Sequence, residues 1–180
     1  DVASQGFNGT TATDNGYGIM ISSGGGYNIY FNTVVLNTNQ GAGAASGITA
    51  AINLASGLGV GAINLQNNIL GNSQTVGANR YAILSASANT TFASINYNDY
   101  YTAGPNLGFI GSNRVDLAAV QAGFGGNANS INFLPTFVSL TDLHLDNTLG
   151  ANWCLNGSGI VIPGITTDKC CYKGWFFCQK

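Results

Sequence analysis

A repeated apolar phrase that carries asparagine at a fixed place constrains the fold of this chain more than any other feature. The phrase occurs three times, at residues 27–36, 62–70 and 92–101. In each copy, apolar residues alternate with other residues up to an asparagine. A pair of apolar residues follows that asparagine. Self-similarity at this period predicts stacked repeats that bury their apolar faces against one another. The shared asparagines are Asn32, Asn68 and Asn98, spaced 36 and 30 residues apart.

A shorter apolar phrase precedes each long one, at 17–21, 48–52 and 81–85. Two strand-like phrases per repeat, without helical periodicity between them, predict a β-solenoid. We therefore expect an all-β parallel β-helix of about four to six coils. The three asparagines would form an internal ladder, with their amides hydrogen-bonded along the stack. The expected repeats are 17–45, 46–78, 79–105 and 106–138.

One short segment has a helical pattern. Residues 113–121 place apolar side chains at 115, 117 and 120, with Asn113 as a candidate N-cap. Beyond this helix, the apolar residues of 131–145 predict further short strands, and Pro135 marks an edge or a bend.

The composition excludes two classes of partner. No apolar run approaches the roughly 18 to 20 residues that a membrane-spanning helix needs, so we expect no membrane insertion. The chain has seven acidic and five basic residues, which gives a net charge of -2. So few cations cannot neutralise a row of phosphates, and we expect no nucleic acid partner.

All four cysteines lie near the end of the chain. An even number in a chain with only 7% charged residues indicates an extracellular, oxidising location and two disulfides. The adjacent cysteines should each pair with one of the other two, and either pairing fits the sequence. Zinc binding is the alternative, but the spacing lacks the C-x2-C of ordinary structural sites. The four residues are Cys154, Cys170, Cys171 and Cys178.

The end of the chain differs in composition from the rest. Residues 169–180 contain all three lysines and three of the four cysteines. We predict a parallel β-helix domain at 1–168, followed by a cysteine-rich cap or attachment tail at 169–180. A cloning remnant or a misread sequence is the alternative for the tail. The start at Asp1 without methionine suggests a processed mature form.

Several phrases resemble a known family. They are Asn-Ala-Asn-Ser-Ile-Asn-Phe-Leu-Pro-Thr-Phe-Val at 127–138, Thr-Asp-Leu-His-Leu at 141–145, Asn-Asp-Tyr-Tyr at 98–101 and Gly-Ile-Thr-Thr-Asp at 164–168. From about residue 17 to 168, the chain resembles the C-terminal part of secreted, pectate-lyase-like right-handed parallel β-helix proteins on the surfaces of Bacteroidetes-like bacteria.

The chain departs from that family pattern at 149–154 and in the cysteine tail, which stand where the family has a Ser-Pro phrase and an Asp-Gly-Arg-like ending. The resemblance implies a secreted, right-handed β-helix. It implies little about activity, because one fold supports many functions.

Two carboxylates lie close enough in the sequence to form a candidate catalytic pair. Glycoside hydrolysis needs two carboxyl groups about 5 to 10 Å apart. Asp142 and Asp146 are the closest pair in the sequence, and with His144 they would share one face of an extended strand. Because the intervening leucines would fill the core, we interpret the three polar residues as a solvated face.

Lyase chemistry requires calcium-binding acids beside a basic residue. The basic residues before the tail, Arg80 and Arg114, have no pair of aspartates nearby in sequence. We therefore predict no enzymatic activity, no catalytic residue, no metal site and no cofactor.

Two sets of residues remain as candidate surface sites. Aromatic faces with a polar edge suit sugars, although core packing should claim at least one of the two adjacent tyrosines. Three Asn-x-Ser/Thr sequons would mark exposed loops if the host glycosylates them. The candidate sugar contacts are Tyr97, Tyr100 and Tyr101, and the candidate glycosylation sites are Asn8, Asn89 and Asn156.

The expected function is that of a non-enzymatic extracellular structural protein at the cell surface. Solenoid ends carry open strand edges, which favour pairing with another chain. The partner would be a further copy stacked end to end in a filament, or the rest of a longer adhesin. A carbohydrate-binding module that takes a polysaccharide is the alternative, and a polysaccharide lyase or hydrolase is the weaker one.

Overall fold

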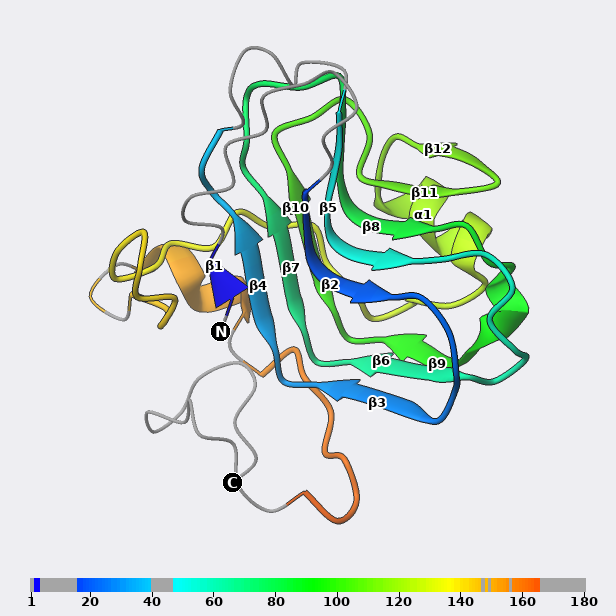
Figure 1. Cartoon of the computed structure of the whole chain (residues 1–180). Helices are drawn as coiled ribbons and strands as arrows, with labels where there is room; N and C mark the ends of the chain where they lie inside the picture. The colour runs from blue at the N-terminus through cyan, green and yellow to red at the C-terminus, as the bar shows by residue number, and fades with distance from the viewer. Residues whose placement is uncertain are drawn as a thin grey trace.

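The structure is a computed structural model in which most elements are strands of parallel β-sheets (Figure 1). One α-helix, α1 (Leu117–Phe124), accompanies the strands. The residues described are 2–3, 16–39, 47–146, 148, 150–155 and 157–165, with the backbone alone at 2–3 and 151.

Three sheets contain all the named strands. Sheet A has the order β1 (Val2–Ala3), β4 (Thr33–Leu36), β7 (Ile69–Asn72) and β10 (Asp99–Thr102). Sheet B has the order β12 (Ser112–Arg114), β11 (Gly108–Ile110), β8 (Asn79–Ser85), β5 (Ile48–Leu54) and β2 (Gly16–Ile21). Sheet C has the order β3 (Tyr27–Tyr30), β6 (Ile63–Gln66) and β9 (Phe92–Asn96).

The chain passes through sheets B, C and A in the same order three times, from β2 to β10. Each strand pairs in parallel with its counterpart in the next pass. The sequence predicted two strand phrases per repeat, but the structure has three strands per pass. Each long phrase bends just before its shared asparagine, so that its first half lies in sheet C and its second half in sheet A.

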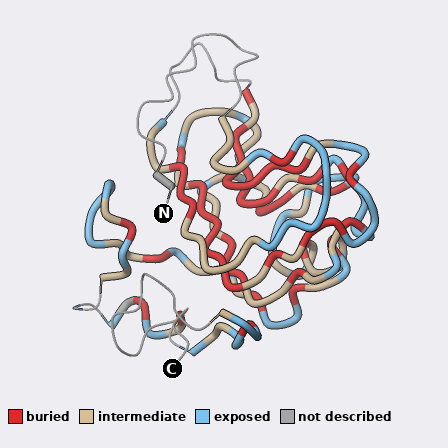
Figure 2. The backbone as a smooth tube through the Cα atoms, turned by 60° about the horizontal axis from the view of Figure 1, so that its bottom comes forward, coloured by how far each residue is buried: buried red, intermediate tan, exposed pale blue. Residues whose placement is uncertain are grey.

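Equivalent apolar residues stack in register between the three sheets. Val34 lies opposite Leu70 and Leu70 opposite Tyr100 in sheet A, and all three are fully buried. In sheet B, Ile52 lies opposite Ile83. These stacks form one core, and Figure 2 shows the buried segments running side by side through the strands. Burial of such side chains stabilises a fold by about 1.5 to 3 kcal/mol each.

The fourth pass is different. β11 extends sheet B, and β12 then folds back antiparallel to it. Helix α1 follows, and its Phe124 ring packs edge-on against Phe92 of β9, with ring centroids 5.7 Å apart. The predicted helix is therefore present, but its N-cap is Asp116, whose carboxylate accepts from Ala119 N at 2.8 Å. Asn113, the predicted cap, lies in β12 instead.

After α1 the chain returns to sheet A, where Ile131 forms a single parallel bridge with Asp99. The described part of residues 133–155 lies beside sheet A, on the side away from sheets B and C, whereas residues 157–165 run below sheet C, where Ile160 pairs with Asn67 (Figure 1). The strands predicted in 131–145 are absent from the described residues. The only further bridge there joins Phe137 to Leu145.

The segment beside sheet A is organised by side-chain hydrogen bonds. Asn152, in the 3₁₀-helix η3 (Gly150–Leu155), is fully buried. It accepts from Thr136 N at 2.9 Å and donates to Thr136 O at 2.8 Å and Asp146 O at 2.9 Å. Backbone bonds also cross this segment around the Phe137–Leu145 bridge, from Val138 N to His144 O and from Asp146 N to Thr136 O, each at 2.9 Å.

Candidate functional site: the asparagine ladder and its two ends

The turn from sheet C to sheet A has the same geometry in all three passes. Phe31, Asn67 and Tyr97 have positive φ angles of 57°, 57° and 56°. This left-handed conformation bends the chain from sheet C into sheet A and suits asparagine or glycine better than an aromatic residue. The next residue in each pass is the shared asparagine, and the turn directs its side chain along the stack.

The three asparagines form a continuous chain of hydrogen bonds, as the repeat predicted. Asn32 donates to Oδ1 of Asn68 from its backbone N at 3.0 Å and from Nδ2 at 3.1 Å. Asn68 donates in the same way to Oδ1 of Asn98, at 3.0 Å from each nitrogen. The ladder therefore has a direction, with each asparagine donating to the one in the following pass.

The ladder also satisfies carbonyl groups at the turns. Asn68 Nδ2 lies 2.9 Å from both Ile29 O and Gln66 O, and Asn98 Nδ2 lies 2.9 Å from Leu65 O. These carbonyl groups belong to the last two residues of β3 and β6, next to the bend. A buried polar group without a partner costs about 1 to 3 kcal/mol. The ladder is therefore a structural element of the fold.

The C-terminal end of the ladder is closed by hydroxyl and amide groups. Asn98 N donates to Ser130 Oγ at 3.0 Å, and Ser130 Oγ donates to Asn127 Oδ1 at 2.9 Å. The buried hydroxyl of Tyr100 accepts from Asn98 Nδ2 at 3.1 Å and donates to Asn127 Oδ1 at 2.8 Å. Burial raises the pKa of Tyr100, so this hydroxyl keeps its proton.

The N-terminal end of the ladder is different. Asn68 and Asn98 each accept two hydrogen bonds at Oδ1, whereas Oδ1 of Asn32 accepts none from the described residues. Asn32 lies two residues after the end of β3, which is the outermost strand of sheet C among the described residues. Within that part of the chain, the ladder therefore ends at Asn32.

One carboxyl group of the described residues is buried beside the ladder. Asp99 is fully buried on the outer side of sheet A, where its Oδ1 accepts from Phe133 N at 2.9 Å and its Oδ2 has no hydrogen-bond partner among those residues. Burial raises the pKa of Asp99 well above its ordinary value, although the bond from Phe133 acts in the opposite direction. Sequence analysis missed this residue. The sequence did contain a signal. In the aligned repeats, Asp99 takes the position that Thr33 and Ile69 hold in the two preceding passes, and that position is apolar in one of them.

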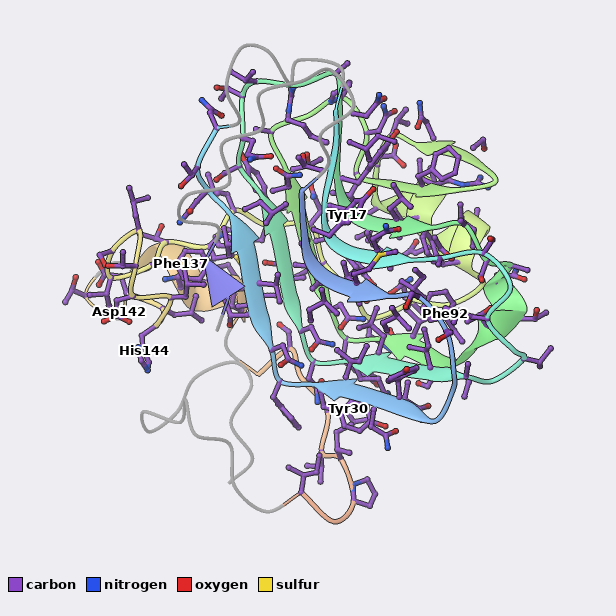
Figure 3. The ribbon with its side chains drawn as sticks, viewed as in Figure 1. Tyr17, Tyr30, Phe92, Phe137, Asp142 and His144 are labelled. Carbon is purple, nitrogen blue, oxygen red and sulfur yellow. The ribbon has the colours of Figure 1, made fainter. Side chains whose placement is uncertain are left out.

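The polar residues at 142–146 lie at the surface (Figure 3). His144 Nδ1 and Asp142 Oδ1 are 2.5 Å apart, with side-chain exposures of 56% and 46%. Asp146 instead accepts from Thr148 N at 2.8 Å and Thr148 Oγ1 at 2.7 Å. These hydrogen bonds lower the pKa of both aspartates. Leu143 is buried beneath them, so the arrangement matches the solvated face that the sequence indicated.

The three tyrosines do not form a common sugar-binding surface. Tyr100 is fully buried and uses its hydroxyl in the ladder, so its candidacy as a sugar contact was wrong. It points into the core because its neighbours in register, Leu70 and Val34, do so as well. Tyr97 and Tyr101 are half-buried, at the turn and in β10.

Some predicted residues fall outside the described part of the chain. These include Cys170, Cys171 and Cys178, the tail at 169–180, and the sequon asparagines Asn8 and Asn156. Cys154 is half-buried in η3 and forms no disulfide within the described residues. Asn89 is exposed at the start of the 3₁₀-helix η2 (Asn89–Thr91).

A shallow hollow lies between η2, β9 and the end of α1. It has a volume of about 280 Å³ and is lined by Phe92, Phe124, Ile95 and neighbouring small or polar residues, without a charged side chain. Across the described residues, no three histidine, cysteine or acidic side chains converge as a metal site would require. No helix in that part of the chain has the length and apolar character to span a membrane.

Comparison with known proteins adds no relative. No family model, no curated protein and no solved structure matches the chain. The functional interpretation therefore depends on the geometry alone.

Proposed function

We propose that this chain is a non-enzymatic structural module of an extracellular surface, built as a right-handed parallel β-helix. The ladder of Asn32, Asn68 and Asn98 is the observation that supports the proposal. Its side-chain amides hydrogen-bond to one another and so hold successive passes together, which is a structural role. The cyclic order of the three sheets supports the β-helix. Parallel strands joined by a crossover are right-handed in about 98% of cases, which favours that hand.

The distribution of acids supports the absence of catalysis. General acid–base chemistry needs groups that converge on a substrate. Among the described residues, Asp99 is enclosed, and Asp142 and Asp146 are held by exposed local hydrogen bonds. The hollow beside α1 offers no titratable group. A polysaccharide lyase or hydrolase is therefore the less supported alternative.

The two ends of the stack favour an adhesin-like module over a uniform filament. Helix α1 and the antiparallel β12 occupy the C-terminal end, where a second copy would need to continue the sheets. A head-to-tail fibre requires two complementary ends. We therefore propose that attachment to another copy or to the rest of a longer surface chain uses the N-terminal end of the stack.

Sedimentation and electron microscopy of the full chain test this proposal, together with incubation with a panel of acidic and neutral polysaccharides. We expect discrete particles, no fibres, and no release of reducing ends or unsaturated products. Fibres would favour the alternative in which copies stack end to end in a filament. Release of products would overturn the non-enzymatic proposal. Alkylation of four thiols only after reduction would support the two disulfides and an oxidising location.

A further inference from the structure

A strap of chain covers the outer face of sheet A. The strap is the described part of residues 131–155, which bridges to β10 at Ile131 and then lies beside the sheet, on the side away from sheets B and C (Figure 1). Alternate residues of a strand face opposite sides. Val35, Ile69 and Asp99 therefore face away from the core, and all three are buried. One carboxyl group is thus enclosed beside apolar side chains on the face that the strap covers.

The strap contacts β10 through a short series of hydrogen bonds. Ile131 N donates to Asn98 O at 2.9 Å, and Ile131 O accepts from Tyr100 N at 3.0 Å. Two residues further along, Phe133 N donates to Oδ1 of Asp99 at 2.9 Å. This last bond ends on a titratable side chain, so the contact between strap and sheet depends on the charge of Asp99.

The chain is anchored on both sides of the strap by uncharged groups. Before the strap, Ser130 Oγ accepts from Asn98 N at 3.0 Å. After it, Ile160 N donates to Asn67 Oδ1 at 2.9 Å, and Ile160 O accepts from Asn67 Nδ2 at 2.7 Å. Amides and hydroxyls keep their protonation state while a carboxyl group titrates. The strap can therefore lift between two anchors that do not change with pH.

The enclosed carboxyl group is suited to the protonated form. Oδ2 of Asp99 is buried and has no hydrogen-bond partner among the described residues. Placing a charge in such a site is costly, and burial raises the pKa of Asp99 well above its ordinary value, although the bond from Phe133 opposes this change. Lifting the strap would let water solvate the carboxylate. Ionisation therefore favours the lifted position.

Other titratable groups do not neutralise Asp99. On its own strand, the hydroxyl of Tyr100 bonds on the core side of the sheet, and half-buried Tyr101 shares the outer face without a hydrogen bond to Asp99. The strap adds the half-buried thiol of Cys154 in η3 and exposed residues 142–146. The charged side chains of the described residues all bond to other groups, and they are Arg80, Arg114, Asp116, Asp142, His144 and Asp146.

We propose that the strap is a pH-sensitive switch, which is closed over sheet A while Asp99 holds its proton and lifts when Asp99 ionises, with the three sheets still folded. Lifting breaks the bond from Phe133 N and exposes the outer face around Ile69 to water. The inference goes beyond the proposed function and does not depend on it.

Native-state hydrogen exchange of the full chain from about pH 4 to pH 8 tests the switch, with each rate divided by that of the unstructured amide. Ile131 and Phe133 should exchange faster than Ala82, whose N donates to Leu107 O at 3.0 Å inside sheet B. Their normalised rates should rise with pH by up to about tenfold per pH unit. Equal protection at Ala82 and the strap would mean that the strap opens only when the whole protein unfolds, and would overturn the proposal.

The sign of the change at Phe133 provides a second check. If ionised Asp99 remained under the strap, its carboxylate would accept more strongly from Phe133 N and slow the exchange of that amide. Slower exchange at Phe133 with rising pH, or a rate independent of pH, would contradict the switch.

Two variants of Asp99 separate its charge from its hydrogen bond. Asp99→Asn keeps an acceptor for Phe133 N, and Asp99→Ile copies Ile69, which occupies the same position in the preceding pass. Both variants should exchange at Ile131 with a normalised rate that no longer changes with pH. His144→Gln is the control on the strap and should keep the rise. A rise that persists in folded Asp99→Asn or Asp99→Ile, or that disappears in His144→Gln, would overturn the assignment to Asp99.

Discussion

The side-chain amide of Asn68 donates to Oδ1 of Asn98 at 3.0 Å, and both residues are fully buried. The same side chain accepts two bonds from Asn32 at its own Oδ1. Asn68 therefore links three successive passes of the chain, and its hydrogen bonds run along the stack, across the direction of the strands.

Asn68→Ala should destabilise the protein by about 3 kcal/mol, because buried carbonyl and amide groups on both sides lose their partners. The midpoint of urea unfolding measures this loss. Asn64→Ala is the matched control, since Asn64 Nδ2 donates to Asn28 Oδ1 at 2.9 Å in an exposed pair on sheet C. The control should change stability by no more than about 0.5 kcal/mol. Equal losses of stability for the two substitutions would show that the buried ladder stabilises the fold no more than an exposed asparagine pair does.

Tyr97→Asn should stabilise the fold by about 1 kcal/mol, because Tyr97 holds a φ of 56° that asparagine adopts with less strain. Asn67 already fills the equivalent position in the preceding pass. Tyr97→Ala is the control, since it removes the ring and keeps the strained Cβ. Thermal unfolding should rank the asparagine variant above both the unmodified chain and the alanine variant. An asparagine variant no more stable than the alanine variant would contradict the role of the φ angle, and two variants less stable than the unmodified chain would show that ring packing outweighs backbone strain.

The ladder was predictable because it depends only on the spacing of like residues. The division of each long phrase between two sheets was not predictable in the same way. Phe31 and Tyr97 occupy the left-handed turn positions, and neither residue type signals a turn. Asn67 is the one residue of the three whose type matches its conformation, and a single match cannot establish a period.

Tertiary contacts explain the other differences. Asn67 pairs with the backbone of Ile160, accepting at 2.9 Å and donating at 2.7 Å, and no local pattern indicates a contact between residues so far apart. The N-cap of α1 is Asp116 and not Asn113, because Asn113 forms part of strand β12. The side of sheet A that faces the C-terminal segment is buried, so polar–apolar alternation failed to identify Asp99 as enclosed.

Gly18→Ala should destabilise the protein by about 1 to 3 kcal/mol through overpacking. A Cβ at this position in β2 would lie 2.3 Å from Val34 Cγ1 and 2.7 Å from Ala51 O, in the interior between sheets A and B. Gly59→Ala is the control, because nothing lies within 4 Å of its Cβ position. Urea unfolding should separate the two variants. A neutral Gly18→Ala would imply that the sheets separate easily at this level.

Stability should fall as pH rises because of Asp99, whose buried carboxyl has a raised pKa. A group that binds its proton more tightly in the folded state contributes stability fully below its unfolded pKa, near 3.8. That contribution is lost as pH rises toward the folded pKa, with a slope of up to about 1.4 kcal/mol per pH unit. The described residues include no ion pair to Asp99 that would oppose this trend.

Asp99→Asn should remove most of this pH dependence, because the amide stays neutral and its oxygen can still accept from Phe133 N. Urea unfolding from about pH 4 to pH 8 provides the measurement. Asp142→Asn is the control, since the lowered pKa of that exposed carboxyl acts in the opposite direction and should leave the fall in stability intact. An unchanged profile for Asp99→Asn would mean that Asp99 ionises freely, so that the C-terminal segment does not enclose it in solution.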